Sequence, residues 1–221
     1  LLKVIILSIV EGVTEFLPVS STGHLILVNE FVKLEPEKFA NAFNVIIQLG
    51  AILSVVVLYF SKLNPWDFEK TKRYFPKNYA KLNGQSKFYY RLTHPYKETI
   101  ELWKRVIVGV IPAGILGFLF DDIIDEYLFN PMVVALMLFV WGIGIISIEN
   151  KNKKENRQRV DNISLISYKT AFFIGCFQVL AMIPGTSRSA ATIIGAMILG
   201  LSRSASAEFS FFLAIPTMLG A

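Results

Sequence analysis

Three segments of the sequence are apolar and long enough to cross a lipid bilayer, at about residues 39–60, 102–120 and 131–148. A membrane-spanning helix needs roughly 20 mostly apolar residues. A fourth apolar segment begins at about residue 205. Hydrophobic residues make up 53% of the chain and charged residues 18%, whereas soluble domains carry about 25% charged residues. We therefore predict an all-α integral membrane protein, organised as one polytopic domain over residues 1–221.

Two further apolar stretches, residues 1–32 and 167–199, are each interrupted by a polar segment. The first interruption is LPVSSTGH at residues 17–24, and the second is IPGTSRS at residues 183–189. Proline lacks the amide hydrogen that a helix needs, and glycine loosens the backbone, so neither stretch is expected to form one straight helix. Each is predicted to be a re-entrant helical hairpin. Its polar loop at membrane depth must be buried in protein or line a wet cavity.

The charged residues between the apolar segments predict which side of the membrane each loop occupies. Residues 61–105 carry 11 Lys and Arg against four acidic residues, and residues 149–169 carry six against three. A turn predicted at residues 121–130 has four acidic residues and no basic one. Because loops rich in Lys and Arg stay in the cytoplasm, the two basic loops are predicted inside and the acidic turn outside. The first hairpin then enters the membrane from the outside and the second from the inside.

Net charge and cysteine content exclude several classes of protein. The formal net charge is only +5, and both basic loops flank predicted spans. We therefore expect these loops to be membrane-flanking tethers, with no nucleic acid as a partner. The single cysteine, Cys176, excludes an intrachain disulfide. A multi-pass membrane protein remains.

The two interrupted stretches also form an internal repeat. A shift of 166 residues aligns Pro18 with Pro184, Ser21 with Ser187 and Phe43 with Phe209. Three predicted spans separate the hairpins, an odd number, so the two copies are expected in opposite orientations, with their polar loops facing each other near the midplane. We predict an inverted repeat, with a first copy at residues 1–148 and an incomplete second copy at residues 167–221. If the second copy resembles the first, two more spans follow residue 221.

Glu11 and Glu15 are the acidic residues that precede Pro18 in the first hairpin. They are four residues apart, so on a helix both carboxylates project from one face. Two adjacent carboxylates in a medium of low dielectric repel each other unless a cation intervenes. The sequence leaves two candidates for that cation. One is a divalent metal, Mg²⁺ or Ca²⁺, which takes one or two carboxylates together with phosphate oxygens. The other is Arg188, in an ion pair that holds two half-helices together.

Arg188 is the basic residue of the second polar loop. Ser187 or Ser189 beside it would cap a helix N-terminus, where free amide groups favour an anion. The guanidinium fork matches phosphate geometry and always stays charged. The loop therefore predicts a phosphate site; the alternative is a simple capped turn with a structural arginine.

The first polar loop contributes serine hydroxyls and the imidazole of His24. Histidine can act as a base near neutral pH, and a nearby serine can act as a nucleophile once it is deprotonated. Opposite a phosphate-binding arginine, these groups would supply the positioning and charge stabilisation that phosphoryl transfer needs. A pyrophosphate is therefore the expected ligand of the two loops.

Two motifs carry a resemblance to a known family. Residues 11–24, EGVTEFLPVSSTGH, and residues 184–192, PGTSRSAAT, resemble the signatures of bacterial undecaprenyl-pyrophosphate phosphatases of the bacitracin-resistance type. The resemblance implies hydrolysis of undecaprenyl pyrophosphate, which recycles the lipid carrier for peptidoglycan synthesis. It also implies an inverted-repeat fold with six spans, a divalent cation and a homodimer in the bacterial cell membrane. The active site is expected to open toward the outer face.

The resemblance also assigns roles to the motif residues. Ser21 is the expected nucleophile, His24 its activator or a second candidate, and Arg188 the phosphate clamp. Glu11 and Glu15 are expected to hold the metal or to act as acid and base, which makes Glu15 a catalytic candidate too. The expected pyrophosphate-binding residues are Ser20, Thr22, Gln48, Gly185, Thr186, Ser187, Ser189 and Thr192.

Other functions fit parts of the same pattern. Inverted repeats with broken helices also occur in transporters, so a polyprenyl-phosphate transporter or flippase is the alternative function. A structural membrane scaffold is a third hypothesis. A second class of membrane phosphatases has similar loops but uses two histidines. The other histidine of this chain, His94, lies in the predicted cytoplasmic loop, which excludes that class.

Overall fold

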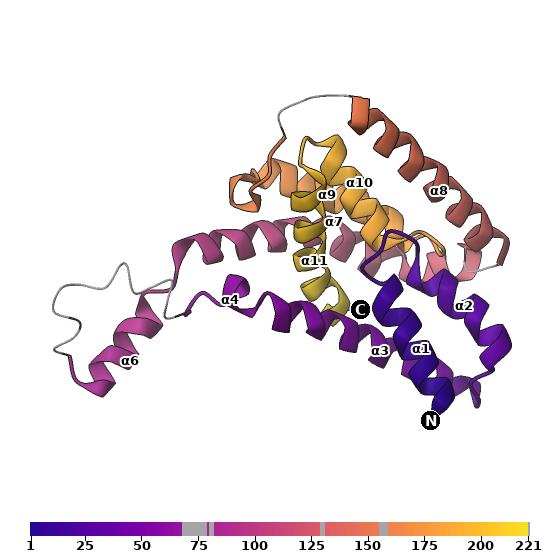
Figure 1. Cartoon of the computed structure of the whole chain (residues 1–221), viewed down its shortest axis with the longest axis horizontal. Coiled ribbons are helices and arrows are strands. Elements are labelled where there is room, and N and C mark those ends of the chain that lie inside the picture. Colours follow the sequence, from indigo (N-terminus) through magenta and orange to yellow (C-terminus); the bar gives the residue numbers. More distant parts are fainter. Residues whose placement is uncertain (68–78, 80–81, 129–130, 155–158, 221) are drawn as a thin grey trace.

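The computed structural model of the chain describes all residues except 68–78, 80–81, 129–130, 155–158 and 221. The described residues form helices, and the bridge between Val160 and Leu201 is their one isolated β-contact. The α-helices are α1 (Leu2–Thr14), α2 (Ser21–Val32), α3 (Glu37–Leu58), α4 (Phe60–Leu63), α6 (Gly84–Thr93), α7 (Lys97–Leu128), α8 (Pro131–Lys154), α9 (Tyr168–Val179), α10 (Arg188–Ile198) and α11 (Arg203–Gly220) (Figure 1). Two short 3-10 helices, η3 (Ile163–Leu165) and η4 (Leu180–Met182), flank α9. The predicted all-α class is confirmed.

Three helices in the described part of the chain are long and apolar enough to cross a membrane. The segments concerned are Lys38–Leu58 in α3, Lys97–Phe120 in α7 and Met132–Lys151 in α8. They coincide with the three spans expected from the sequence. Large apolar side chains point outward from them; for example, Val57 is 74% exposed and Phe118 is 91% exposed. A contiguous apolar exterior is unfavourable in water but matches a lipid solvent. The chain is thus a multi-pass membrane protein.

Helix α7 is longer than expected, because it continues through Leu128 where we predicted a turn at residues 121–130. Residues 121–128, DDIIDEYL, contain neither glycine nor proline, so nothing in them breaks a helix. Helix α8 then begins at Pro131. Proline is favoured at a first helical position, where its missing amide hydrogen costs nothing. The predicted turn was therefore wrong over most of its length, and its acidic residues belong to the last turns of α7.

Each interrupted apolar stretch folds as two helices joined by a short polar loop. In the first hairpin, Ser20 has φ +64° and its Oγ accepts the amide hydrogen of the third residue of α2. In the second, Gly185 turns the chain at φ +89°, and Ser187 caps α10 in the same way. Helix α1 packs on α2, and α9 packs on α10. The insertion of these hairpins into the membrane from opposite sides stays a prediction.

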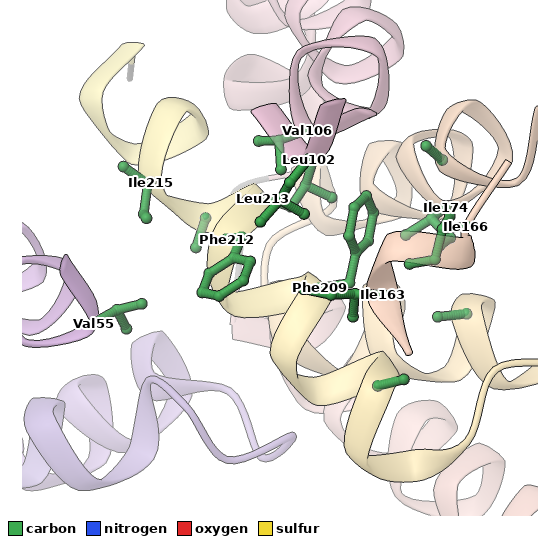
Figure 2. Packing of buried hydrophobic residues seen from close by; sticks show 14 of the residues in the cluster. Val55, Leu102, Val106, Ile163, Ile166, Ile174, Phe209, Phe212, Leu213 and Ile215 are labelled. Carbon is green, nitrogen blue, oxygen red and sulfur yellow. The ribbon is translucent and has the colours of Figure 1, made fainter. Parts of the chain in front are cut away.

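Helix α11 is the centre of the main hydrophobic core. Its Phe209, Phe212 and Leu213 are fully buried and contact side chains from α3, α7, α9 and the η3 turn (Figure 2). A smaller cluster, which includes Leu7 and Phe43, joins α1, α2 and α3. Because α11 packs on α3, α7 and α10, and α3 packs on α1, the two clusters together hold both hairpins in place. Their polar loops are thereby brought to one point in the bundle.

Candidate active site

The polar loops of the two hairpins meet at one cavity of about 270 Å³. The Nη2 atom of Arg188 lies 2.5 Å from Oε1 of Glu15, a residue 173 positions away in the sequence. The hydroxyl of Ser189 donates to the carbonyl oxygen of Leu17 at 2.9 Å. The loops therefore contact each other directly. The cavity is lined by Glu15, Ser20, Ser21, Thr22, Gln48, Ala181, Thr186, Ser187, Arg188, Ser189, Thr217 and Met218.

Two helices begin at this cavity. Ser21 is the first residue of α2, Ser187 is the N-cap of α10, and both line the cavity wall. The first amide groups of a helix have no partner within the helix and carry a partial positive charge. Two helix N-termini and a guanidinium therefore favour an anion with several charges in the same space.

Glu15 contacts both Ser21 and Arg188. Its Oε2 accepts a hydrogen bond from the Ser21 hydroxyl at 2.5 Å, and its Oε1 pairs with Arg188 at 2.5 Å. The side chains of the ion pair are 7% exposed for Glu15 and 13% for Arg188. The ion pair that the sequence offered as an alternative to a metal is thus present. Breaking a buried pair by removing one partner costs about 3–5 kcal/mol, because a buried charge is left uncompensated.

Arg188 is held in position by α11 and by its own helix. Its Nη1 donates to the carbonyl oxygen of Ser210 at 3.3 Å. The hydroxyl of Thr192 lies 2.9 Å from the carbonyl oxygen of Arg188 and 2.6 Å from the hydroxyl of Ser210. Thr192 is fully buried and does not line the cavity. Thr192 therefore fixes the start of α10 against α11, and its expected contact with phosphate stays a prediction.

Gly185 also lies outside the cavity lining, although we expected it to bind pyrophosphate. At its φ of +89°, a Cβ atom would lie 2.6 Å from both Cα and the carbonyl oxygen of Val134 in α8. Only glycine lets the loop approach α8 this closely. The neighbouring Thr186 does line the cavity, and its Oγ1 accepts a hydrogen bond from Nε1 of Trp141 at 3.1 Å. Gly185 therefore allows the loop to pack closely against α8, and its expected contact with pyrophosphate stays a prediction.

His24 is half-buried and does not line the cavity. Its Nδ1 lies 2.9 Å from the carbonyl oxygen of Ser20. Since a carbonyl oxygen only accepts, Nδ1 is the donor in this contact. The hydroxyl of Ser21 donates to Glu15 instead. The position beside the Ser21 hydroxyl that we expected for His24 is thus occupied by Glu15, and catalytic roles for Ser21 and His24 stay predictions.

Glu11 is fully buried one helical turn before Glu15 and is not part of the cavity lining. Neither of its carboxylate oxygens has a hydrogen-bond partner among the described residues. The charged groups that act on it are Glu15 and Arg188. The described residues contain no cluster of three or more His, Cys, Asp and Glu side chains. The two unpartnered oxygens of the Glu11 carboxylate, beside the Glu15 carboxylate, nonetheless fit Mg²⁺ or Ca²⁺, which take oxygen ligands and complete their shells with water or phosphate.

The part of the cavity wall that α11 supplies, and the contact from α9 that supports it, were not predicted from the sequence. Thr217 and Met218 line the cavity, and Oγ1 of Thr217 accepts a hydrogen bond from Nε2 of Gln178 at 3.1 Å. Gln178 is 2% exposed. Polar groups in membrane helices face the protein interior, so an amide or a hydroxyl within an apolar run indicates a buried polar site. Gln178 and Thr217 both show this pattern in the sequence.

The fold and the site together define a class of protein. It is a multi-pass helical membrane protein with a cavity, lined mostly by polar side chains, where two helical hairpins meet. The model of the family described as bacitracin resistance protein BacA matches residues 4–221. The chain belongs to this family.

Three curated relatives are similar over nearly the whole chain. Undecaprenyl-diphosphatase of Limosilactobacillus fermentum is 53% identical over 100% of this chain and 72% of its own length. Undecaprenyl-diphosphatase of Enterococcus faecalis is 50% identical over 100% of this chain and 73% of its own length. Undecaprenyl-diphosphatase 1 of Clostridioides difficile is 52% identical over 99% of this chain and 72% of its own length.

Proposed function

We propose that this chain is an undecaprenyl-diphosphatase, a hydrolase that converts undecaprenyl pyrophosphate and water to undecaprenyl phosphate and inorganic phosphate. The product returns to peptidoglycan synthesis as the lipid carrier. The observation that carries the proposal is the convergence of Arg188, Glu15 and Ser21 on one cavity. The substrate class is supported by relatives of that name at 50–53% identity.

The cavity wall supplies the groups that bind a diphosphate. The Arg188 guanidinium clamps phosphate oxygens, and the hydroxyls of Ser187 and Ser189 and the first amides of α2 and α10 complete the contacts. The polyprenyl tail stays in lipid beside the apolar helices. The binding groups belong to both hairpins, so the substrate itself bridges the two loops.

Phosphate binding also prepares the nucleophile. The incoming phosphate oxygens compete with Glu15 for Arg188, which frees the Glu15 carboxylate to accept the proton of the Ser21 hydroxyl. Oγ of Ser21 then attacks the terminal phosphorus, and the bond from that phosphorus to the bridging oxygen breaks. Undecaprenyl phosphate leaves, and Glu15 returns the proton to the former bridging oxygen, which restores the carboxylate. Water then attacks the phosphoserine while Glu15 removes a proton from the water, and Glu15 passes that proton to Oγ of Ser21 as the bond from Oγ to phosphorus breaks and inorganic phosphate is released.

We also propose that Glu11 and Glu15 hold a divalent cation, Mg²⁺ or Ca²⁺, during turnover. Bound there, the cation would offset the negative charge of the diphosphate. The orphaned oxygens of the buried Glu11 carboxylate support this assignment. Chelation is expected to abolish phosphate release, and either metal should restore it.

The Glu11→Gln variant is expected to need about tenfold more metal for half-maximal activity, because it replaces one anionic ligand with a neutral amide. A metal titration of phosphate release measures this shift. Glu149→Gln is the matched control, because Glu149 lies away from the cavity and pairs with Arg203. Turnover that survives chelation, with the same metal response in Glu11→Gln and the unmodified chain, would show that the two carboxylates work without a metal.

We propose an orientation and an assembly for the chain as well. The basic segments at residues 61–105 and 149–169 support a cytoplasmic position for those ends of the helices. An active site open toward the outer face agrees with that orientation. The family resemblance supports a homodimer in the bacterial cell membrane.

The test of the function is reconstitution of the chain in liposomes that contain undecaprenyl pyrophosphate. Phosphate release and lipid movement across the bilayer are measured in the same sample. We expect phosphate release, and we expect Glu15→Gln to lower it by about 100-fold or more through loss of the base. Glu208→Gln is the control, because Glu208 pairs with Lys62 outside the cavity. Lipid movement without phosphate release would favour the transporter, and the absence of both would fit a scaffold. Full phosphate release by Glu15→Gln would contradict the role of Glu15 as the base.

A further inference from the structure

Helix α6 lies beyond the ends of two membrane-spanning helices (Figure 1). The segment that follows α4 is tied to the start of α7, because the amide of Tyr96 donates to the carbonyl oxygen of Pro65 at 2.6 Å. The same segment is tied to α6, since Nε1 of Trp66 donates to the carbonyl oxygen of Leu92 at 3.3 Å. These contacts therefore hold α6 beside the ends of the spans in α3 and α7.

One face of α6 is apolar and exposed. Phe88 is 70% exposed, Tyr89 69% and Leu92 55%. At 3.6 residues per turn, these three positions fall within about 100° of the helix circumference. Trp66, bonded to the end of α6, is 49% exposed and adds a fourth large side chain.

The opposite face of α6 has partners within the chain. The ring of Tyr90 stacks on His94 with centroids 4.0 Å apart and meets the ring of Tyr79 edge-on at 5.6 Å. The ammonium of Lys87 lies 6.0 Å from the centre of the Tyr79 ring. The internal contacts are thus made by one side of the helix, and the aromatic side chains on the other side face outward.

We propose that Phe88, Tyr89 and Leu92 of α6, together with Trp66, lie in the headgroup region of an anionic lipid surface. Aromatic side chains with one apolar and one polar end are favoured at this depth. An amphipathic helix binds there through its apolar face, and basic residues add attraction to anionic lipid. Residues 61–105, which include this helix, carry 11 Lys and Arg against four acidic residues. The bilayer that α3 and α7 already cross supplies the surface.

Spin labelling of the full chain tests the position of this face. In a Cys176→Ser background, a nitroxide is attached at Phe88→Cys or at Ser86→Cys, an exposed position on another side of α6. The protein is reconstituted in phosphatidylcholine alone or mixed with phosphatidylglycerol. We expect the label at position 88 to be relaxed more by oxygen, which concentrates in lipid, and the label at 86 more by a water-soluble nickel complex. Phosphatidylglycerol should shift position 88 further toward oxygen.

The basic residues are tested separately. Lys87→Glu combined with Lys97→Glu is expected to remove the added shift that phosphatidylglycerol causes at position 88. Phosphate release by the same samples verifies that each variant is folded. The proposal fails if positions 86 and 88 respond equally to the nickel complex in both vesicle types. It also fails if position 88 is shielded from both reagents regardless of the lipid, which would indicate a protein partner.

Discussion

Replacing Arg188 by alanine is expected to lower kcat/KM for phosphate release from undecaprenyl pyrophosphate by about 10³-fold. Removal of one donor that stabilises developing charge typically costs about 10²–10³-fold, and an arginine that stabilises phosphoryl transfer contributes about 10³–10⁵-fold. Arg188 is the cationic side chain of the cavity wall, so few other groups there can take over its charge. Kinetics of the reconstituted variant against the unmodified chain measure the loss.

The same substitution also removes the partner of Glu15, so activity and folding must be separated. The buried Glu15 carboxylate would be left uncompensated, at a cost of about 3–5 kcal/mol. The double variant Glu15→Gln/Arg188→Ala is expected to regain most of that stability in thermal unfolding, because the orphaned charge is gone. It should remain inactive. Arg188→Lys keeps a charge but lacks the planar fork, so it should retain the fold with intermediate activity.

Arg203→Ala is the matched control for these variants. Arg203 is the first residue of α11, as Arg188 is the first residue of α10, but its side chain is 73% exposed and pairs with Glu149. Its replacement should change kcat/KM by less than about twofold, since exposed ion pairs contribute about 1 kcal/mol at most. A folded Arg188→Ala variant with kcat/KM within a few-fold of the unmodified chain would contradict the phosphate-clamp role.

The meeting of the two polar loops was accessible from the sequence because it follows from local chemistry. Proline and glycine interrupt two apolar stretches at residues 17–24 and 183–189, and polar backbone at membrane depth needs a buried or wet environment. The i, i+4 spacing of Glu11 and Glu15 predicts that both carboxylates project from one face of a helix. The free-energy cost of burying a guanidinium predicts that Arg188 has an anionic partner. These inferences need only spacing and solvation.

The order of contacts inside the site was not accessible in this way. The sequence predicted that His24 activates Ser21, because the two residues lie near each other in one loop. In the structure the Ser21 hydroxyl donates to Glu15. The backbone of Ser20 at φ +64° sets how α2 begins, and Nδ1 of His24 then meets the Ser20 carbonyl. Which acceptor a hydroxyl selects depends on ångström-scale geometry that a motif does not encode.

Contributions from distant helices were missed for a related reason. Thr217 and Met218 reach the cavity only because α11 packs in the centre of the bundle, and Thr192 is withdrawn from it by its bond to Ser210. Periodicity identifies the buried face of a helix but not the neighbour that it meets. The continuation of α7 to Leu128 was missed because acidic residues were read as a turn, although their sequence has no helix breaker.

Ser21→Ala is the second substitution with a large expected effect, a fall in kcat of about 10³-fold or more with KM changed little. An enzyme loses most of its rate when its nucleophile is removed, and the remaining activity comes from binding and charge stabilisation. In the proposed mechanism the Ser21 hydroxyl contributes its oxygen to the reaction, whereas Arg188 and the helix N-termini, which lie at the same cavity, would hold the substrate. Ser54→Ala is the control, because the Ser54 hydroxyl bonds to the carbonyl oxygen of Ala51 within α3.

The chemistry distinguishes a nucleophile from a hydroxyl that only positions Glu15. A nucleophilic Ser21 forms a phosphoserine, so rapid acid quenching with substrate labelled on the terminal phosphate should leave label on the unmodified chain and none on Ser21→Ala. A positioning hydroxyl predicts no labelled protein and only about a tenfold loss of kcat, in keeping with one hydrogen bond to a charged group. Near-normal turnover of Ser21→Ala would assign the attack to water, with Glu15 as its base. The 2.5 Å contact between Ser21 and Glu15 favours the covalent route, because it places the base on the hydroxyl oxygen that must attack.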